Sequence, residues 1–278
     1  MRLQRINELV NFKPWLITPT AHASIRDLVA RHIDAPSRSN DLDQGFADLV
    51  IQREPMTVTP AGVAVISIRG IVGQGMSRIE KACGNTGTEE VSAELAQAIA
   101  DPRVVGILLD IDSPGGMVGG IPELADRIAE ANQEKPVYVF SLGMICSAAY
   151  WLTCGATGIF VTRSADVGSI GVYLPWIDST VALAQEGLSV EIIRNTGADL
   201  KGAGYPGTSL TPEQRAFLQA DVDEVAAMFQ SAVLDNRPDV SVDAMRGQSL
   251  LAESALAAGL IDGVVRDRDE VLSFLSPS

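Results

Sequence analysis

Two segments of this sequence carry the groups that acyl transfer requires. Ser147 stands in residues 143–150, Gly-Met-Ile-Cys-Ser-Ala-Ala-Tyr, where a helix is expected to begin and the hydroxyl could serve as a nucleophile. Residues 112–116 are Asp-Ser-Pro-Gly-Gly and follow an apolar run. The backbone N–H groups near Gly115 and Gly116 could form an oxyanion hole, which stabilises the negative charge of a tetrahedral intermediate. Together the two segments predict acyl transfer by a nucleophilic serine.

Each segment also has an interpretation that involves no chemistry. A serine at the start of a helix is a common N-cap, and Pro-Gly-Gly is an ordinary connection between a strand and a helix. Cys146 is a second candidate nucleophile, because a thiol is intrinsically more nucleophilic than a hydroxyl. Successive helical residues point about 100° apart, so at most one of Cys146 and Ser147 faces the site.

A serine nucleophile needs a base, and no histidine lies near these segments. The two histidines, His22 and His32, are in the N-terminal region, so a neutral lysine becomes the main candidate. The lysines of the chain are Lys13, Lys81, Lys135 and Lys201. Lys201 lies in a glycine-rich loop, residues 196–204, after an expected strand, and it is the candidate base. The alternative is a solvated loop lysine.

A third side chain could orient the lysine. Ser169 lies in residues 167–172, Val-Gly-Ser-Ile-Gly-Val, a glycine-flanked turn after an apolar strand. A hydroxyl at this place could accept a hydrogen bond from the lysine and direct the lysine lone pair. An ordinary turn serine is the alternative interpretation.

The composition is that of a soluble globular protein. Of the 278 residues, 46% are hydrophobic and 20% are charged, and the net charge is −14. Nucleic acids and anionic membranes both favour a basic surface, so we expect neither as a partner. Cys83, Cys146 and Cys154 show no disulfide or zinc spacing, which indicates a reducing compartment. We expect no metal and no cofactor.

The N-terminus does not resemble a signal peptide, and no segment reaches the roughly 18–20 apolar residues of a membrane span. We therefore expect a cytoplasmic protein. Residues 1–57 form an N-terminal extension, with predicted helices at 2–12 and 23–33 and an extended segment at 13–19. The extension is expected to cap the core or, alternatively, to contact another subunit or a partner. Residues 58–278 form the main domain.

From residue 58 onward the sequence alternates between strands and helices. The predicted strands cover residues 63–68, 104–111, 137–140, 158–162 and 190–194. The predicted helices cover residues 88–100, 120–132, 147–154, 211–234 and 252–259. The run at 104–111 is continuously apolar, which is typical of a strand buried on both faces. This alternation predicts an α/β fold with a mainly parallel sheet and helices on both sides.

The order of these motifs resembles that of the signal peptide peptidase A (protease IV) family of Ser–Lys peptidases. The matching elements are Asp-Ser-Pro-Gly-Gly at 112–116, the Ser147 segment, Gly-Ser-Ile-Gly at 168–171, Gly-Ala-Asp-Leu-Lys at 197–201 and Gly-Leu-Ile-Asp-Gly at 259–263. Each motif is weak alone, but the five occur in the family's order, and the resemblance extends from about residue 58 to residue 265.

The resemblance implies a ClpP/crotonase-like α/β fold and a role for each site residue. Ser147 would be the nucleophile, Lys201 the general base, and Ser169 the hydroxyl that positions the lysine. The amides near Gly115 and Gly116 would form the oxyanion hole. Members of this family often assemble into rings in which neighbouring subunits shape the cleft, so the resemblance also implies a homo-oligomer.

The sequence departs from the family pattern in two places. Membrane-bound members carry an N-terminal anchor, which we do not expect here, and the family usually places glycines where Ala148 and Ala149 follow the nucleophile. Residues 148–151 and the Lys-Pro-Trp-Leu-Ile segment at 13–17 look more like the phage and prophage branch. Enzymes of that branch are associated with head assembly and cleave scaffold, portal or their own chains. This implies phage structural proteins as partners.

The leading hypothesis is a soluble serine endopeptidase that uses a Ser–Lys dyad on an extended polypeptide, bound by β-addition. A crotonase-like acyl-CoA enzyme is the second hypothesis. It would use the glycine turn as an oxyanion hole, but it needs acidic catalytic groups and leaves Ser147 and Lys201 without roles. The third is a catalytically inactive capsid assembly factor, which would not need a lysine in the glycine-rich loop.

Overall fold

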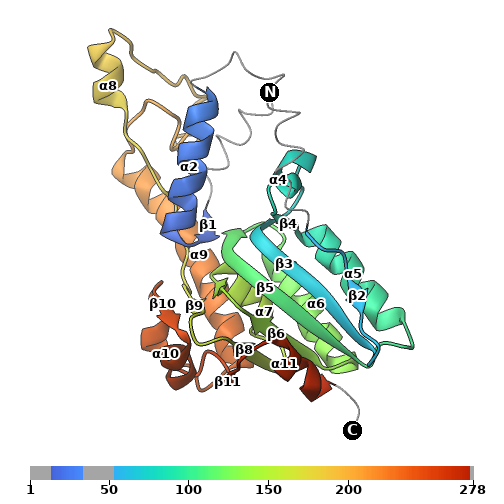
Figure 1. Cartoon of the computed structure of the whole chain (residues 1–278). Coiled ribbons are helices and arrows are strands. Elements are labelled where there is room, and N and C mark those ends of the chain that lie inside the picture. Colours follow the sequence, from blue (N-terminus) through green and yellow to red (C-terminus); the bar gives the residue numbers. More distant parts are fainter. Residues whose placement is uncertain (1–13, 34–52, 276–278) are drawn as a thin grey trace.

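The computed structural model describes residues 14–33 and 53–275, which form an α/β fold (Figure 1). The strands of the described part are β1 (Trp15–Ile17), β2 (Thr57–Val58), β3 (Val63–Gly73), β4 (Thr86–Gly87), β5 (Gly106–Met117), β6 (Val137–Ser141), β7 (Met144–Cys146), β8 (Gly158–Val161), β9 (Asp166–Gly168), β10 (Ser249–Leu251) and β11 (Gly263–Val264). The helices are α2 (Pro19–Ile33), α4 (Arg78–Ala82), α5 (Thr88–Ala100), α6 (Ile121–Glu134), α7 (Ala148–Thr153), α8 (Thr180–Gln185), α9 (Pro212–Asn236), α10 (Ala252–Ala257) and α11 (Arg268–Leu275), with a 3-10 helix at Val242–Met245.

β5 is the central strand of the sheet. It pairs in parallel with β3 along most of its length, with β6 at residues 107–110 and with β7 at Ser113. β8 and β11 continue the sheet beyond β6, and β9 and β10 continue it beyond β7. Among the described strands, only β1, β2 and β10 run antiparallel to their neighbours. The predicted α/β fold with a mainly parallel sheet flanked by helices is therefore confirmed.

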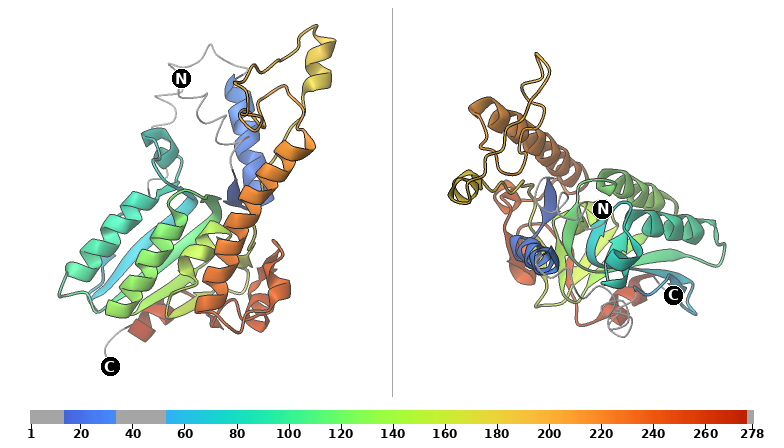
Figure 2. Two further views of the ribbon diagram at one scale, coloured as in Figure 1. Left: turned by 180° about the vertical axis from the view of Figure 1, so that it is seen from behind. Right: turned by 90° about the horizontal axis from the view of Figure 1, so that it is seen from above.

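Helices cover both faces of the sheet, as the continuous apolar run of β5 predicts. On β3, Ala64, Ile66 and Ile68 belong to the main core, which α5, α6 and α7 close. Val63 and Val65 point to the opposite face and pack in a smaller cluster with α11. Figure 2 (left) shows α5, α6 and α9 side by side over the first face. Burying each Val, Leu or Ile contributes roughly 1.5–3 kcal/mol, so these alternating faces hold the strands in one register.

Helix α7 is fixed in the core by aromatic residues. Tyr150 is fully buried and donates its hydroxyl hydrogen to the carbonyl oxygen of Leu260 at 2.8 Å. Trp151 stacks on Phe229 of α9, with ring centroids 4.8 Å apart and an interplanar angle of 5°. Because α7 begins directly after Ser147, these contacts hold the backbone of that serine in place.

Residues 174–211 form an arm that carries α8 and extends away from the sheet (Figures 1 and 2). The strand predicted at 190–194 lies in this arm and is wrong, because the segment has no regular secondary structure. Its β-branched residues favour a strand, but a strand needs a paired neighbour, and no described strand pairs with this segment. The arm instead exposes large apolar side chains, with Ile193 at 91%.

Most other predicted elements agree with the structure within a few residues. The helix predicted at 88–100 is α5 with the same bounds, and the helix predicted at 211–234 is α9. The turn predicted at 114–116 is absent, because these residues belong to β5. β5 continues to Met117, because residues 115 and 116 pair with β3 on one edge and with β1 on the other.

Part of the predicted N-terminal extension lies outside the described residues. The helix predicted at 2–12 lies there, whereas the helix predicted at 23–33 falls within α2 and the extended segment contains β1. β1 pairs with the end of β5, so this part of the extension contacts the core. The division into residues 1–57 and 58–278 stays a prediction.

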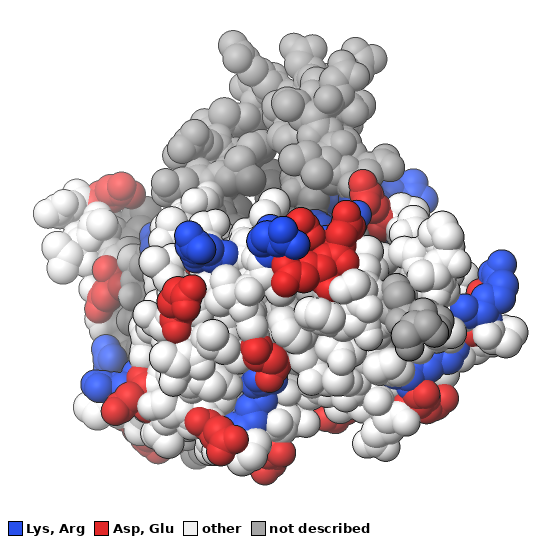
Figure 3. All heavy atoms as spheres, turned by 60° about the horizontal axis from the view of Figure 1, so that its bottom comes forward, with Lys and Arg blue, Asp and Glu red and all other residues white. Residues whose placement is uncertain are grey.

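The face of the molecule in Figure 3 carries basic and acidic side chains close together, with broad uncharged areas between them. No continuous basic patch is present on that face, in line with the net charge of −14. Within residues 14–33 and 53–275, no helix combines the length and the apolar composition that crossing a membrane requires.

Candidate active site

Ser147 lies at the turn that joins β7 to α7. Its backbone has φ 54° and ψ −117°, and Ser147 and Ser169 are the only described residues other than glycine with positive φ. A serine in this region is strained by about 1–3 kcal/mol, and such residues cluster at functional sites. The helix predicted at 147–154 therefore starts one residue later. Hydrolases present a nucleophilic serine on the same kind of sharp strand-to-helix turn.

The hydroxyl of Ser147 is buried and unpaired. Its side chain makes no capping hydrogen bond to α7, so the interpretation as an ordinary N-cap serine does not hold. Oγ has no hydrogen-bond partner within the described protein, although the residue is only 1% exposed. A buried unpaired hydroxyl costs about 1–3 kcal/mol, so stability alone does not account for this side chain.

Gly115 and Gly116 bring the end of β5 against Ser147. Gly115 has φ 109°, and a Cβ atom on it would lie 2.9 Å from Cβ of Ser147 and 3.0 Å from the carbonyl oxygen of Cys146. Only glycine permits both this conformation and this close approach. The N–H of Gly115 already donates to Oγ of Ser113 at 3.2 Å. The structure thus brings Ser147 and the two glycines together, and their role as an oxyanion hole stays a prediction.

Gly116 leaves no room for a side chain. A Cβ atom there would lie 1.8 Å from the carbonyl oxygen of Val72 in β3. Gly116→Ala should therefore force β3 and β5 apart, destabilise the fold by about 3 kcal/mol and lower Tm by roughly 6–12 °C. Gly119→Ala is the matched control, because the nearest described atom is Oε1 of Gln74 at 3.7 Å. Thermal unfolding measures the difference, and equal Tm values for the two variants would contradict this expectation.

Ser169 is the second strained serine of the site. It has φ 50°, is buried, and donates its N–H to the carbonyl oxygen of Gln248 at 2.8 Å. β7 and β9 pair in parallel with Cys146 opposite Gly168, and the N–H of Ser147 donates to the carbonyl oxygen of Gly168 at 2.7 Å. Ser147 and Ser169 therefore follow the ends of two neighbouring strands.

Lys201 does not reach Ser147 within one chain. It lies in the arm with its side chain exposed, whereas Oγ of Ser147 has no hydrogen-bond partner in the described structure. The N–H of Lys201 donates to the carbonyl oxygen of Ala198 at 3.0 Å, and Arg194 donates to the carbonyl oxygen of Lys201. The structure thus gathers Ser147, the glycines and Ser169, but it leaves the candidate base outside.

The thiol of Cys146 contacts β9 and β10. Sγ lies 3.6 Å from the carbonyl oxygen of Asp166 and 3.6 Å from Oγ of Ser249. The pKa of this thiol is raised to about 11, mainly by burial; the hydrogen bond with Ser249 lowers it, and the charges of Asp166 and Asp112 raise it. Because the thiolate is the nucleophilic form, this cysteine is unsuited to the role at neutral pH.

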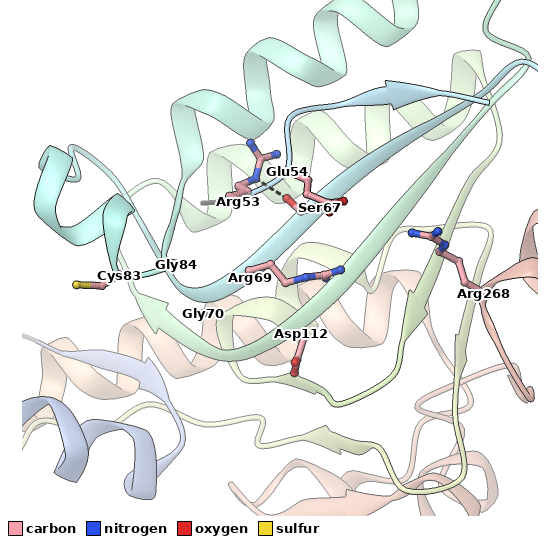
Figure 4. A pocket seen from close by; sticks show the side chains of 9 residues that line it. All are labelled: Arg53, Glu54, Ser67, Arg69, Gly70, Cys83, Gly84, Asp112 and Arg268. Atoms are coloured by element: carbon pink, nitrogen blue, oxygen red, sulfur yellow. Dashed lines mark hydrogen bonds between the residues drawn. The ribbon is translucent and has the colours of Figure 1, made fainter. Parts of the chain in front are cut away.

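A pocket of about 540 Å³ elsewhere on the sheet is lined by none of the five predicted site residues. In Figure 4, Arg69 reaches from β3 toward β5, where it pairs with Asp110 at 2.8 Å, and Arg268 pairs with the same carboxylate at 3.1 Å. Arg53 pairs with Glu94. Arg69 and Arg268 share the single negative charge of Asp110, but Glu54 and Asp112 also line the pocket, so it has no excess of positive charge that would favour an anion. Within the described residues, no group of three or more His, Cys, Asp and Glu side chains is placed to hold a metal ion.

The sequence did not predict that β1 forms part of this site. β1 pairs with residues 115–117, which include Gly115, the glycine that approaches Ser147 closely. Its residues, Trp-Leu-Ile, are strong strand formers between two prolines, Pro14 and Pro19. That local pattern indicates an extended segment, but it does not show which sheet edge the segment joins.

A mainly parallel α/β fold with a strained, unpaired serine between a strand and a helix has the arrangement of hydrolytic enzymes. The sequence profile of peptidase family S49 matches residues 129–275, which is more than half of the chain. The chain belongs to this peptidase family, and the predicted family is confirmed.

Two phage proteins are among the relatives of this chain. Capsid assembly protease C of Escherichia phage lambda is 34% identical over 213 residues, which cover 76% of this chain and 48% of that protein. The head-tail preconnector protein GP5 of Enterobacteria phage P21 is 32% identical over 213 residues, which cover 76% of this chain and 42% of that protein. The chain therefore spans less than half the length of both relatives.

Among solved structures, a ClpP1 mutant from Listeria monocytogenes is similar to this chain. The TM-score is 0.45 and the sequence identity is 14%, with 74% of this chain and 92% of that chain covered. This likeness concerns the fold alone.

Proposed function

We propose that this chain is a serine endopeptidase with Ser147 as its nucleophile. The observation that carries the proposal is the hydroxyl of Ser147, which is buried, unpaired and held on a strained turn. Membership of a peptidase family supports hydrolysis of peptide bonds. A crotonase-like acyl-CoA enzyme would leave this serine without a role, and an inactive assembly factor would have no use for a buried, unpaired hydroxyl.

The proposed reaction proceeds through an acyl-enzyme. Oγ of Ser147 attacks the carbonyl carbon of the peptide bond while its proton passes to Nζ of Lys201, which acts as the general base. The amides near Gly115 and Gly116 stabilise the oxyanion. The C–N bond then breaks, and the lysine returns the proton to the leaving amine. A water molecule hydrolyses the ester, again with the lysine as base, and Ser147 is restored.

Lys201 would come from a neighbouring copy of the chain. Within one chain its side chain is exposed on the arm, and Oγ of Ser147 lacks a partner. The arm exposes large apolar side chains, which are typical of protein–protein contacts. They include Ile177, Val181, Leu188 and Ile193. We infer a homo-oligomer in which the arm of one subunit covers the site of the next, and Ser169 accepts a hydrogen bond from the incoming lysine.

The proposed substrate is an extended polypeptide that adds a strand to the end of β5. One relative is named a capsid assembly protease and the other a head-tail preconnector protein, which supports phage structural proteins as substrates and partners. The setting would be the cytoplasm of a bacterial host or the phage prohead. The proposed mechanism requires no cofactor, metal, membrane or nucleic acid.

Covalent labelling tests the nucleophile directly. A fluorophosphonate reacts with activated serines, and mass spectrometry of the labelled chain is expected to find one modified residue, Ser147. Ser169→Ala should still be labelled, but more slowly, whereas Ser147→Ala should not be labelled. Modification of Ser169 or Cys146 instead, or no modification of the folded and assembled protein, would reject the proposal. Turnover of an acyl-CoA by Ser147→Ala would favour the alternative enzyme.

A further inference from the structure

β1 lies between two other segments of the chain at the candidate active site. On one edge it runs antiparallel to the end of β5 (Figure 1). The opposed residues are Trp15 and Met117, Leu16 and Gly116, and Ile17 and Gly115. On the other edge, Trp15 forms an antiparallel bridge with Tyr173, with backbone hydrogen bonds of 2.9 and 3.2 Å. β1 therefore fills the space between β5 and the segment that follows Ser169.

β1 passes directly beside Ser147. The point that a Cβ atom of Gly115 would occupy is 2.1 Å from the carbonyl oxygen of Leu16 and 2.9 Å from Cβ of Ser147. From its N-terminal end, β1 runs toward this point. The backbone then continues past the glycine, where the N–H of Thr18 donates to the carbonyl oxygen of Pro114 at 3.0 Å. The N-terminal segment thus crosses the site where a substrate carbonyl would have to lie.

β1 is bound as a peptide is bound when it adds a strand to a sheet. Its backbone pairs on both edges, and its side chains alternate between two sides, as in any extended strand. Leu16 is fully buried in the main core, whereas Trp15 and Ile17 pack on the opposite side with Met117 and Tyr173. An extended substrate strand could form the same backbone hydrogen bonds and place its side chains where those of Leu16, on one side, and of Trp15 and Ile17, on the other, now lie.

β1 is also short enough to be displaced. It has three residues, and an incoming substrate strand would restore the backbone pairing and the apolar burial that β1 loses when it leaves. The hydroxyl of Tyr173 is buried beside β1 and has no hydrogen-bond partner in the described structure.

We propose that β1 occupies the peptide-binding groove of the resting enzyme and must leave before a substrate strand can enter. This inference rests on the proposed peptidase function and narrows its substrate class. The substrate is an extended polypeptide with a bulky aliphatic side chain at the position of Leu16, on the N-terminal side of the bond that is cut. β1 then covers Ser147 in the resting enzyme, and its own sequence indicates which substrate sequences the groove accepts.

A reversible disulfide tests whether β1 must leave. Trp15→Cys and Tyr173→Cys place two thiols in a hydrogen-bonded antiparallel pair, in which Cα atoms lie about 5.5 Å apart, within the range that a disulfide bridges. Cys83→Ser removes the exposed native thiol, and Ser147→Ala prevents turnover. The probe is a fluorescein-labelled peptide with the sequence of residues 14–20, Pro-Trp-Leu-Ile-Thr-Pro-Thr, and fluorescence polarisation measures its binding.

The reduced protein is expected to bind this peptide at least about 10-fold more tightly than the oxidised protein, because only the reduced form lets β1 move aside. A peptide with aspartate in place of its leucine should bind at least about 10-fold more weakly than the original. Equal affinity of the two redox forms, or no binding to either, would overturn the proposal. The binding measurement uses Ser147→Ala and requires no reaction, so its result does not depend on catalysis. Failed fluorophosphonate labelling of the wild-type chain would therefore count against the proposed function and not against the role of β1.

Hydrogen exchange of the wild-type chain gives a second measurement that needs no engineered disulfide. The amides of residues 15–17 should exchange at least about 100-fold faster than those of β3, because β1 opens without unfolding the sheet. Equal protection of the two strands would show that β1 is a permanent part of the sheet, and this would also overturn the proposal.

Discussion

Replacing Ser147 by alanine is expected to lower kcat for peptide hydrolysis by about 10⁴- to 10⁶-fold. Under the proposed mechanism, the substitution removes the atom that forms the ester, and the amides near Gly115 could then assist only the direct attack of water. The fold should be unaffected, because Oγ of Ser147 makes no hydrogen bond in the described structure. Initial rates of fluorescent casein digestion, with thermal unfolding of the same samples, provide the measurement.

Cys146→Ser is the matched control, one residue earlier in the chain. Its thiol contacts β9 and β10, and a pKa of about 11 keeps it protonated. This variant should therefore keep kcat within about threefold of the wild-type value. Ordinary turnover by Ser147→Ala, or complete loss of turnover in Cys146→Ser alone, would show that the nucleophile has been wrongly assigned.

Two inactive variants should regain activity when they assemble together. Lys201→Ala is expected to reduce turnover by about 10³-fold, because the nucleophile then has no base. In a co-expressed mixture with Ser147→Ala, some interfaces join a subunit with an intact serine to a subunit with an intact lysine. With random pairing, about a quarter of the sites are complete, so casein digestion should reach about a quarter of the wild-type rate.

The controls separate a base supplied in trans from a general effect of lysine removal. Lys135→Ala should stay active, because Nζ of Lys135 donates to the carbonyl oxygens of Ala98 and Asp101 within its own chain, at 2.8 Å each. Co-expression of Ser147→Ala with the double variant Ser147→Ala/Lys201→Ala provides no intact serine and should stay inactive. A mixture as inactive as its two parents would contradict the assignment of Lys201 to a neighbouring subunit.

Elements with strong local signals could be predicted closely from the sequence. α9 begins with the capping box of Thr211 and Gln214, whose side chains satisfy the first free N–H groups of the helix. The convergence of Ser147, Gly115 and Ser169 could also be predicted. Each was expected after an apolar strand, and in an open parallel sheet the carboxyl ends of the strands lie together. The short strands β7 and β9, which directly precede the two serines, were not among the predicted elements.

Relationships that depend on distant parts of the chain could not be predicted in this way. The strand predicted at 190–194 failed because β-branched residues form a strand only where a neighbour accepts and donates its hydrogen bonds. The position of β1 depends on which edge near β5 stays open after the rest of the domain has folded. Under the proposed function, the place of Lys201 depends on a second copy of the chain, and local pattern carries no information about assembly geometry.

The strained turn at Ser147 also has an evolutionary consequence. Glycine adopts a φ of 54° without strain and has no hydroxyl to bury. Replacing Ser147 by glycine would therefore remove both the backbone strain and the free-energy cost of the buried, unpaired hydroxyl. Natural proteins are stable by only about 5–15 kcal/mol, so such a saving would matter to a lineage that no longer needed the hydroxyl. Under the proposed function, we expect a serine rather than a glycine to persist at this position only while its hydroxyl serves the reaction.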